Sequence, residues 1–109
     1  MDKTLSIIIP VYNEEQALPL VLPEIISFAQ QHGYQLIMVN DGSKDRSLEI
    51  LKVHSREEAL FKIVNHKVNK GYGGAIKSGI LAGETDYIIT IDADGEHYLE
   101  DVNNKPMQI

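Results

Sequence analysis

The chain contains no cysteine, no signal peptide and no long apolar run. Without cysteine it can form neither a disulfide framework nor a thiolate metal site. The absence of cysteine fits a protein of the reducing cytosol. Its start lacks a basic segment followed by an apolar one, and no apolar run approaches the roughly 18 residues that a membrane span needs. We therefore expect a cytoplasmic protein. A position peripheral to a membrane stays open, because a membrane-embedded substrate is not thereby excluded.

The chain also lacks a surplus of positive charge. Acidic residues outnumber basic ones by 16 to 10, which gives a formal net charge of −6. Proteins that bind nucleic acids usually carry a basic face, so we expect no nucleic-acid partner. An acidic chain can still bind a nucleotide through a bridging cation. The 109 residues, 43% of them hydrophobic, suffice for one small core, and the sequence shows no internal repeat or linker.

Apolar runs alternate with helical periodicity along the chain. Runs rich in apolar and β-branched residues predict strands at 5–11, 35–40, 61–65 and from 86 to an acidic loop at 92. Between them, the spacing of apolar residues predicts helices from about 18 to 33, from about 46 to 53 and over 71–82. This alternation is the pattern of a right-handed parallel α/β sheet. We predict a Rossmann-like parallel sheet flanked by helices.

Several residues define the expected ends and faces of these helices. Pro19 fits a first helical turn, Pro23 should kink the helix, and Gly33 should end it. Ser43 or Asp45 could cap the second helix. The apolar faces are expected to use Leu48, Leu51 and Val53 in the second helix, and Ala75, Ile76, Ile80 and Leu81 in the third.

Acidic residues follow three of the four predicted strands. They are Glu14 and Glu15, Asp41, and then Asp92, Asp94 and Glu96. Parallel α/β sheets bind ligands beyond the carboxyl ends of their strands, where these loops should meet. Residues i and i+2 of a strand point to the same side, so Asp92 and Asp94 can present two hard oxygen donors suited to Mg²⁺ or Mn²⁺. The alternative is an Asp/Gly turn without a ligand, and the Asp-x-Asp-Gly pattern alone does not decide between them.

The glycine-rich segment 71–76 fits neither of two familiar nucleotide motifs. Ile76 stands where a dinucleotide fingerprint needs a small residue, and the segment follows the third predicted strand, not the first. The sequence contains no P-loop motif. These glycines can serve close packing of the helix on the sheet, or close approach of the backbone to a nucleotide at a helix N-terminus.

Four segments together resemble the signatures of the family 2 glycosyltransferases, in order and with the right spacing. They are SIIIPVYNEE (6–15), VNDGSKD (39–45), NKGYGGAIKSG (69–79) and DADGEH (92–97). Within that family they look most like the branch that includes the polyprenyl-phosphate sugar synthases. The resemblance covers nearly the whole chain. It departs at Asn40, where many relatives have Asp, and at Tyr72, where relatives often have Lys or Arg.

The resemblance implies the N-terminal half of a GT-A fold, with a nucleoside-diphosphate-sugar-binding domain at 1–97 and the tail of a truncated domain at 98–109. It implies that the chain binds a UDP- or GDP-sugar, with Asp41 facing the base and accepting its ring N–H. The implied contacts to the nucleotide sugar are Pro10, Tyr12, Glu14, Asp41, Gly71, Gly74, Lys77, Asp92 and Ala93. The implied ligands of Mg²⁺ or Mn²⁺ are Asp94 and Asp92, with Glu96 as a further contact.

The resemblance further implies sugar transfer with inversion to an acceptor such as a polyprenyl phosphate or a glycan. In the family, the general base and most of the acceptor site follow the Asp-x-Asp loop. This sequence stops about a dozen residues after that loop, so we assign no catalytic residue within the chain apart from Asp92 and Asp94, which would act through the metal. The lone histidines His32, His54, His66 and His97 are not assigned a role.

Two other functions stay open. The chain could be a binding module for nucleotide sugars without turnover. It could also be a receiver-like signalling domain, with Glu14 and Glu15 as the acidic pair, although Asn65 occupies the position of its phospho-acceptor Asp and no fifth strand is evident. Because a fragment of a larger sheet would leave one edge uncovered, we expect a homo-oligomer formed through that edge.

Overall fold

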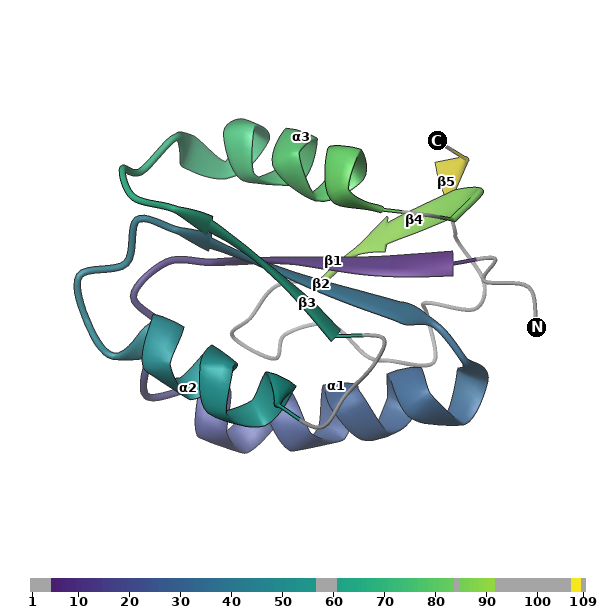
Figure 1. The fold of residues 1–109 in the computed structure, drawn as a ribbon, viewed down its shortest axis with the longest axis horizontal. Coiled ribbons are helices and arrows are strands. Elements are labelled where there is room, and N and C mark those ends of the chain that lie inside the picture. Colours follow the sequence, from purple (N-terminus) through teal and green to yellow (C-terminus); the bar gives the residue numbers. More distant parts are fainter. Residues whose placement is uncertain (1–4, 57–60, 84, 92–106, 109) are drawn as a thin grey trace.

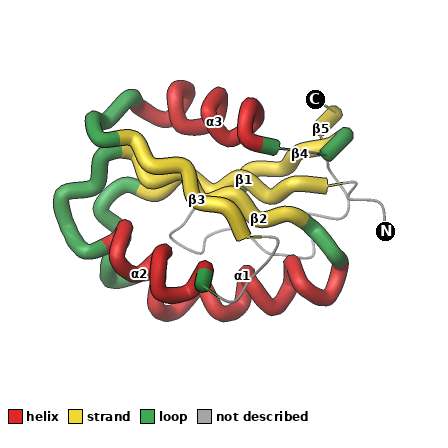
Figure 2. Tube along the Cα trace, viewed as in Figure 1, coloured by secondary structure: helices red, strands yellow, loops and turns green. Residues whose placement is uncertain are grey.

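The computed structural model describes residues 5–56, 61–83, 85–91 and 107–108. In this part of the chain one sheet lies between two layers of helices, with α1 and α2 on one face and α3 on the other (Figures 1 and 2). The strands are β1 (Leu5–Val11), β2 (Gln35–Asp41), β3 (Phe61–His66), β4 (Tyr87–Thr90) and β5 (Met107–Gln108). The helices are α1 (Leu18–His32), α2 (Ser47–Ser55) and α3 (Gly71–Ala82).

The strand order is β3-β2-β1-β4-β5, and β1 to β4 are mutually parallel. The chain builds outward from β1 through β2 to β3, and then returns to place β4 on the other side of β1. The point where strand order reverses therefore lies between β1 and β4, and this is where open α/β sheets bind ligands. The predicted parallel α/β sheet is confirmed.

The expectation of no fifth strand is wrong. The two-residue strand β5 pairs antiparallel with β4, in the register Tyr87 with Gln108 and Ile88 with Met107. Two residues are too few to produce a periodic pattern, so the sequence carried no signal for this strand. It adds an antiparallel edge to an otherwise parallel sheet, as is common in such folds.

The core has two parts because the central strands are buried on both faces. Against α1 and α2, β1 contributes Leu5, Ile7, Ile9 and Val11, and β2 contributes Leu36 and Met38. Against α3, Ile8, Ile37 and Val39 pack with Ala75 and Ile88. This double burial explains why the first two strands read as continuous apolar runs instead of alternating ones.

The predicted apolar faces of α2 and α3 are each wrong at one position. Val53 is 58% exposed and Leu81 is 77% exposed, whereas Leu51 and Gly79 are buried. Residues two positions apart in an α-helix are separated by about 200° around its axis. A residue two positions after a buried one, as Val53 is after Leu51, therefore points away from the sheet. Ile50 of α2 packs against the core where Val53 was expected to do so.

The ends of α1 follow the prediction. Pro19 lies in its first turn, and Gly33 ends it in the left-handed conformation with φ of 69°. The helix continues through Pro23 to His32. Its buried residues Leu18, Leu22, Ile25 and Ala29 recur at helical spacing and lie against the sheet.

Candidate functional site

Three loops meet at the carboxyl edge of the sheet, at the left of Figure 1. They are residues 12–17 after β1, 42–46 after β2 and 67–70 after β3. Glu14 and Glu15 lie in the first loop, and Asp41 ends β2 directly before the second, so all three lie at the edge that the sequence predicted. Asp92, Ala93, Asp94, Glu96 and His97 lie outside the described residues.

Asn13 joins the first loop to the second. Its N–H donates to Ser43 Oγ at 3.0 Å, and its Oδ1 accepts the N–H of Lys44 at 2.7 Å. Asn13 has a φ of 52°, a left-handed conformation that Asn tolerates better than most residues. The side chain of one loop and the hydroxyl of the other thus hold the two backbones together.

Asp45 and Ser47 make the second set of contacts between these loops. Asp45 Oδ2 accepts the N–H of Glu15 at 3.1 Å, and Ser47 Oγ accepts the N–H of Glu14 at 2.9 Å. Asp45 Oδ1 also accepts the N–H of Ser47 at 2.9 Å, at the start of α2. Of the two capping candidates, Asp45 therefore bonds the first turn of α2, while Ser43 binds the first loop instead.

Burial alone would raise the pKa of the Asp45 carboxyl, but hydrogen bonds outweigh it. The Ser47 hydroxyl and N–H and the Glu15 N–H all stabilise the charged form, so the pKa lies below its ordinary value of 3.8. The Asp45 carboxylate is therefore ionised at neutral pH.

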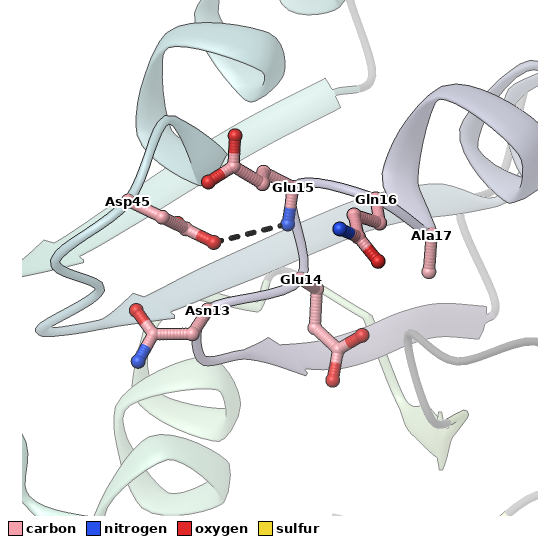
Figure 3. Close-up of a pocket in the computed structure, with 6 residues that line it drawn as sticks. All are labelled: Asn13, Glu14, Glu15, Gln16, Ala17 and Asp45. Carbon is pink, nitrogen blue, oxygen red and sulfur yellow. Dashed lines mark hydrogen bonds between the residues drawn. The ribbon is translucent and has the colours of Figure 1, made fainter.

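The first loop and Asp45 enclose a hollow of about 340 Å³. Its lining residues are Asn13, Glu14, Glu15, Gln16, Ala17 and Asp45 (Figure 3). The Glu14 side chain points away from Asp45 in this view, while the N–H of Glu15 points toward it. The hollow begins two residues after β1, and Asp45 lines it from the loop after β2.

Asp41 joins the second loop to the third. It is the last residue of β2, and its side chain is 5% exposed. Oδ1 accepts the N–H of Lys70 at 2.8 Å, and Oδ2 accepts the N–H of Gly71 at 2.9 Å. The backbone oxygen of Asp41 accepts from Asn69 Nδ2 at 3.1 Å. The negative charge that the N-terminus of α3 favours is thus supplied by this carboxylate.

His66 completes the surroundings of Asp41. Its Nδ1 lies 2.9 Å from Asp41 Oδ1, and its Nε2 lies 2.7 Å from Ser78 Oγ. Burial acts to raise the pKa of Asp41, but the hydrogen bond and charge of His66 and the N–H groups of Lys70 and Gly71 lower it below 3.8. A continuous chain of hydrogen bonds therefore links β2, β3 and α3.

The sequence assigned His66 no role because its partners are distant in the chain. Asp41 and His66 are direct register partners at the ends of neighbouring strands, 25 residues apart. A faint signal existed, because both strands end in a pair of polar residues, Asn40-Asp41 and Asn65-His66. Recognising it requires the register between β2 and β3, which periodicity does not supply.

Asn40 points to the opposite face of the sheet from Asp41. It is 3% exposed and donates from Nδ2 to Asn65 Oδ1 at 2.8 Å, a hydrogen bond that an Asp at this position could not donate. Its Oδ1 is buried and has no hydrogen-bond partner among the described residues. An orphaned buried acceptor is uncommon in folded proteins, and a bound water molecule is the usual partner.

Four further predicted contacts lie at or near the same edge with varied exposure. Pro10 is half-buried near the end of β1, and Tyr12 is 45% exposed. Gly71 and Gly74 lie in the first turn of α3, where Gly71 has a φ of 84°. Lys77 lies midway along α3, on the exposed side of the helix opposite its buried residues.

Among the described residues, no group of three or more His, Asp or Glu side chains could hold a metal ion. The predicted Mg²⁺ or Mn²⁺ site therefore depends on Asp92, Asp94 and Glu96, outside that part of the chain. In the described residues we also find no helix with the length and apolar character to cross a membrane.

The family described as Glycosyl transferase family 2 matches residues 6–104. The undecaprenyl-phosphate 4-deoxy-4-formamido-L-arabinose transferase of Photorhabdus laumondii is 39% identical over 104 residues, covering 92% of this chain and 32% of that protein. The dolichyl-phosphate beta-glucosyltransferase of Dictyostelium discoideum is 33% identical over 108 residues, covering 91% and 33%. The chain spans about a third of the length of the curated relatives that it matches.

Solved structures of low sequence identity share the fold. The mannosyltransferase PcManGT from Pyrobaculum calidifontis, in complex with GDP-Man and Mn²⁺, superposes with a TM-score of 0.78 at 16% identity, covering 94% of this chain and 31% of that one. S. aureus TarS 1–349 in complex with UDP-GlcNAc gives a TM-score of 0.73 at 22% identity, covering 84% and 26%. The predicted N-terminal half of a GT-A fold is confirmed.

Proposed function

The chain belongs to glycosyl transferase family 2, and we propose that it is the part of a glycosyltransferase that binds the nucleoside diphosphate sugar. One observation carries the proposal: side chains from the family motifs bind three loops to one another at the carboxyl edge of the sheet. That edge contains the reversal of strand order at which α/β folds bind nucleotides. Family membership also removes the receiver-like alternative.

Pro10, Tyr12, Glu14 and Asp41 would contact the nucleoside. The exposed ring of Tyr12, next to the last residue of β1, offers a flat apolar surface to a base or ribose. Asp41 is ionised, so its carboxylate accepts hydrogen bonds and donates none. Gly71, Gly74 and Lys77 would lie toward the diphosphate. Lys77 is exposed and offers it a positive charge.

Asp94 and Asp92, with Glu96, would hold Mg²⁺ or Mn²⁺. Carboxylate oxygens are the donors that these hard cations prefer, and such ions are often shared between one or two carboxylates and a diphosphate. Ile91, just before this motif, donates its N–H to Ile8 O at 3.1 Å, so the motif follows a strand that lies directly beside β1. The complex of PcManGT with GDP-Man and Mn²⁺ supports this choice. When bound, the cation would neutralise charge that develops on the departing diphosphate.

The activity of the whole protein would be sugar transfer with inversion to a polyprenyl phosphate or a glycan. The names of the relatives, which include undecaprenyl-phosphate and dolichyl-phosphate transferases, favour the lipid-linked acceptor. A cytoplasmic protein, peripheral to the membrane, would reach such an acceptor. Because this chain spans about a third of those relatives, a binding module without turnover is the second candidate.

The test is a calorimetric titration with UDP and GDP, in the presence and absence of Mn²⁺. We expect binding that requires the metal and that falls about tenfold or more in Asp94→Ala, since tenfold corresponds to about 1.4 kcal/mol. Asp86→Ala is the matched control, because Asp86 is an exposed carboxylate at the other end of β4. Equal binding without metal, or equal loss in both variants, would contradict the proposal.

A further inference from the structure

We infer that His66 is a positioning residue, which holds the Asp41 carboxylate so that one of its oxygens can accept the ring N–H of a nucleobase, and that Ser78 holds His66. This inference rests on the proposed function. The role of His66 is then measurable as a preference for bases that carry a ring N–H, as uracil and guanine do and as cytosine and adenine do not.

The hydrogen-bond count at Asp41 leaves one acceptor position unused among the described residues. A carboxylate offers about four acceptor positions. Oδ1 takes two donors, His66 Nδ1 and Lys70 N, while Oδ2 takes the N–H of Gly71. In the part of the chain that the structure describes, one position therefore remains on Oδ2. An ionised carboxylate accepts and does not donate, so its partner on a ligand must carry a hydrogen.

The order of partners determines what each ring nitrogen of His66 does. Because Nδ1 faces a carboxylate, Nδ1 carries a proton and donates it to Asp41. Nε2 lies 2.7 Å from the Ser78 hydroxyl, which accepts from a charged ring and donates to a neutral one. The His66 and Asp41 side chains are only 6% and 5% exposed, so water competes little for these positions.

The contacts to Asp41 come from two directions and orient the carboxylate plane. A carboxylate rotates easily about its last bond, where the torsional barrier is broad and roughly two-fold. Backbone N–H groups at the start of α3 bind one oxygen each, and the ring of His66 binds Oδ1 from β3. Removing the ring leaves one backbone donor on each oxygen, both from the start of α3, so the carboxylate loses the contact that holds it from the side of β3.

The Ser78 hydroxyl is placed to hydrogen-bond the His66 ring, and not to act as a nucleophile. It lies in α3 beside the buried Gly79 and one turn after Ala75, both of which pack toward the sheet. Its hydroxyl is therefore directed at β3. Asp41, His66 and Ser78 thus connect β2, β3 and α3, and they do not form a catalytic triad for an acyl substrate.

Two substitutions of His66 separate the two ring nitrogens. The amide nitrogen of Asn reaches approximately where Nδ1 lies, so His66→Asn keeps a donor to Asp41. That of Gln reaches approximately where Nε2 lies, so His66→Gln keeps the contact to Ser78 and loses the donor. We would measure dissociation constants for UDP, GDP, CDP, ADP and inorganic pyrophosphate with Mn²⁺.

We expect the wild type to prefer UDP or GDP over CDP and ADP by about tenfold or more, as a hydrogen bond to a charged group can provide. His66→Asn should retain this preference, and His66→Gln should lose most of it, while pyrophosphate binds both variants as it binds the wild type. Ser78→Ala, a milder change, should reduce the preference partly. These outcomes support positioning, because a general loss of fold would weaken pyrophosphate binding too.

Retention of the full preference in His66→Gln or Ser78→Ala would overturn the inference. So would an equal loss for all ligands, pyrophosphate included. A wild type that binds UDP, GDP, CDP and ADP equally with Mn²⁺ would overturn the inference but leave the proposed function standing. A wild type that binds no nucleotide would overturn both.

Discussion

Single side chains of the family motifs hydrogen-bond the loops at the carboxyl edge of the sheet to one another without any ligand. Asp41 bonds the loop after β3, whereas Ser43, Asp45 and Ser47 bond the loop after β1. The sequence predicted the positions of these residues along the chain and Ser43 or Asp45 as a cap of α2; Asp45 accepts the N–H of Ser47, but the N-cap residue is Arg46. The sequence could not predict which loop each side chain would bind, because the partners are about 30 residues away and depend on strand register.

Charge on Asp41 and Asp45 should make stability depend on pH. Both carboxyls have pKa values below 3.8 in the folded state, so their contribution is fully present above that pH and is lost as pH falls through the lowered values. At pH 7, Asp41→Asn should reduce the free energy of unfolding by about 1.5–3 kcal/mol, the usual range for hydrogen bonds to a charged group.

Urea denaturation at pH 7 and at pH 3 tests this dependence. The difference between wild type and Asp41→Asn should shrink at the lower pH, because below pH 3.8 the Asp41 carboxyl of the unfolded chain binds protons more readily than that of the folded protein. Asp86→Asn, at an exposed position, is the control and should change little at either pH. A difference of the same size at both pH values would be inconsistent with the lowered pKa.

Gly42 is a position where only glycine fits. Its φ is 73°, and a Cβ there would collide with the backbone of Asn69. Gly42→Ala should therefore lower the free energy of unfolding by about 2–4 kcal/mol. Gly73→Ala is the matched control, since no atom lies near its hypothetical Cβ, and alanine in a helix should stabilise by about 0.5–1 kcal/mol. Equal midpoints in urea for the two variants would refute this reading.

At the scale of elements, the strands and helices were predictable because each has a clear period or a clear stop signal. Strands β1 and β2 are continuous apolar runs, and α1 has a proline at its start and a glycine at its end. The errors at Val53 and Leu81 concern which face of a helix meets the sheet. An apolar residue beside the buried stripe cannot be distinguished by composition from one within it.

At Gly79, α3 approaches the sheet closely. A Cβ at this position would lie 2.5 Å from Ile8 Cγ2, and Ile8 is completely buried. Gly79→Ala should therefore cost about 1–3 kcal/mol as an overpacked contact. Ile8→Ala removes the clashing methyl. In the double variant, the loss of unfolding free energy should therefore be smaller than the sum of the losses in the two single variants. Strict additivity in thermal or urea unfolding would show that the contact is not shared.

At the scale of the whole molecule, the sheet order was not predictable from the sequence. The alternation of elements implies a parallel sheet, but it does not say that β4 returns beside β1. That return places the reversal of strand order next to the loop at 12–17. The antiparallel β5 was also missed, because its two residues carry no pattern.

The outer side of β3 has no strand partner among the described residues. An unpaired edge is a template for pairing with another chain, so we expect self-association of this 12.2 kDa chain as concentration rises. Light scattering over a range of concentrations measures the mass. A monomeric mass at high concentration would argue against a homo-oligomer.

The most direct test of the donor-binding proposal is to locate the metal–nucleotide complex by nuclear magnetic resonance. Bound Mn²⁺ broadens the amide signals nearest to it. With UDP or GDP present, the account predicts selective broadening in the loops at 12–17, 42–46 and 67–70, and none at the opposite edge near Gly33 or Thr85. Broadening centred on that opposite edge, or no nucleotide-dependent broadening anywhere, would contradict it.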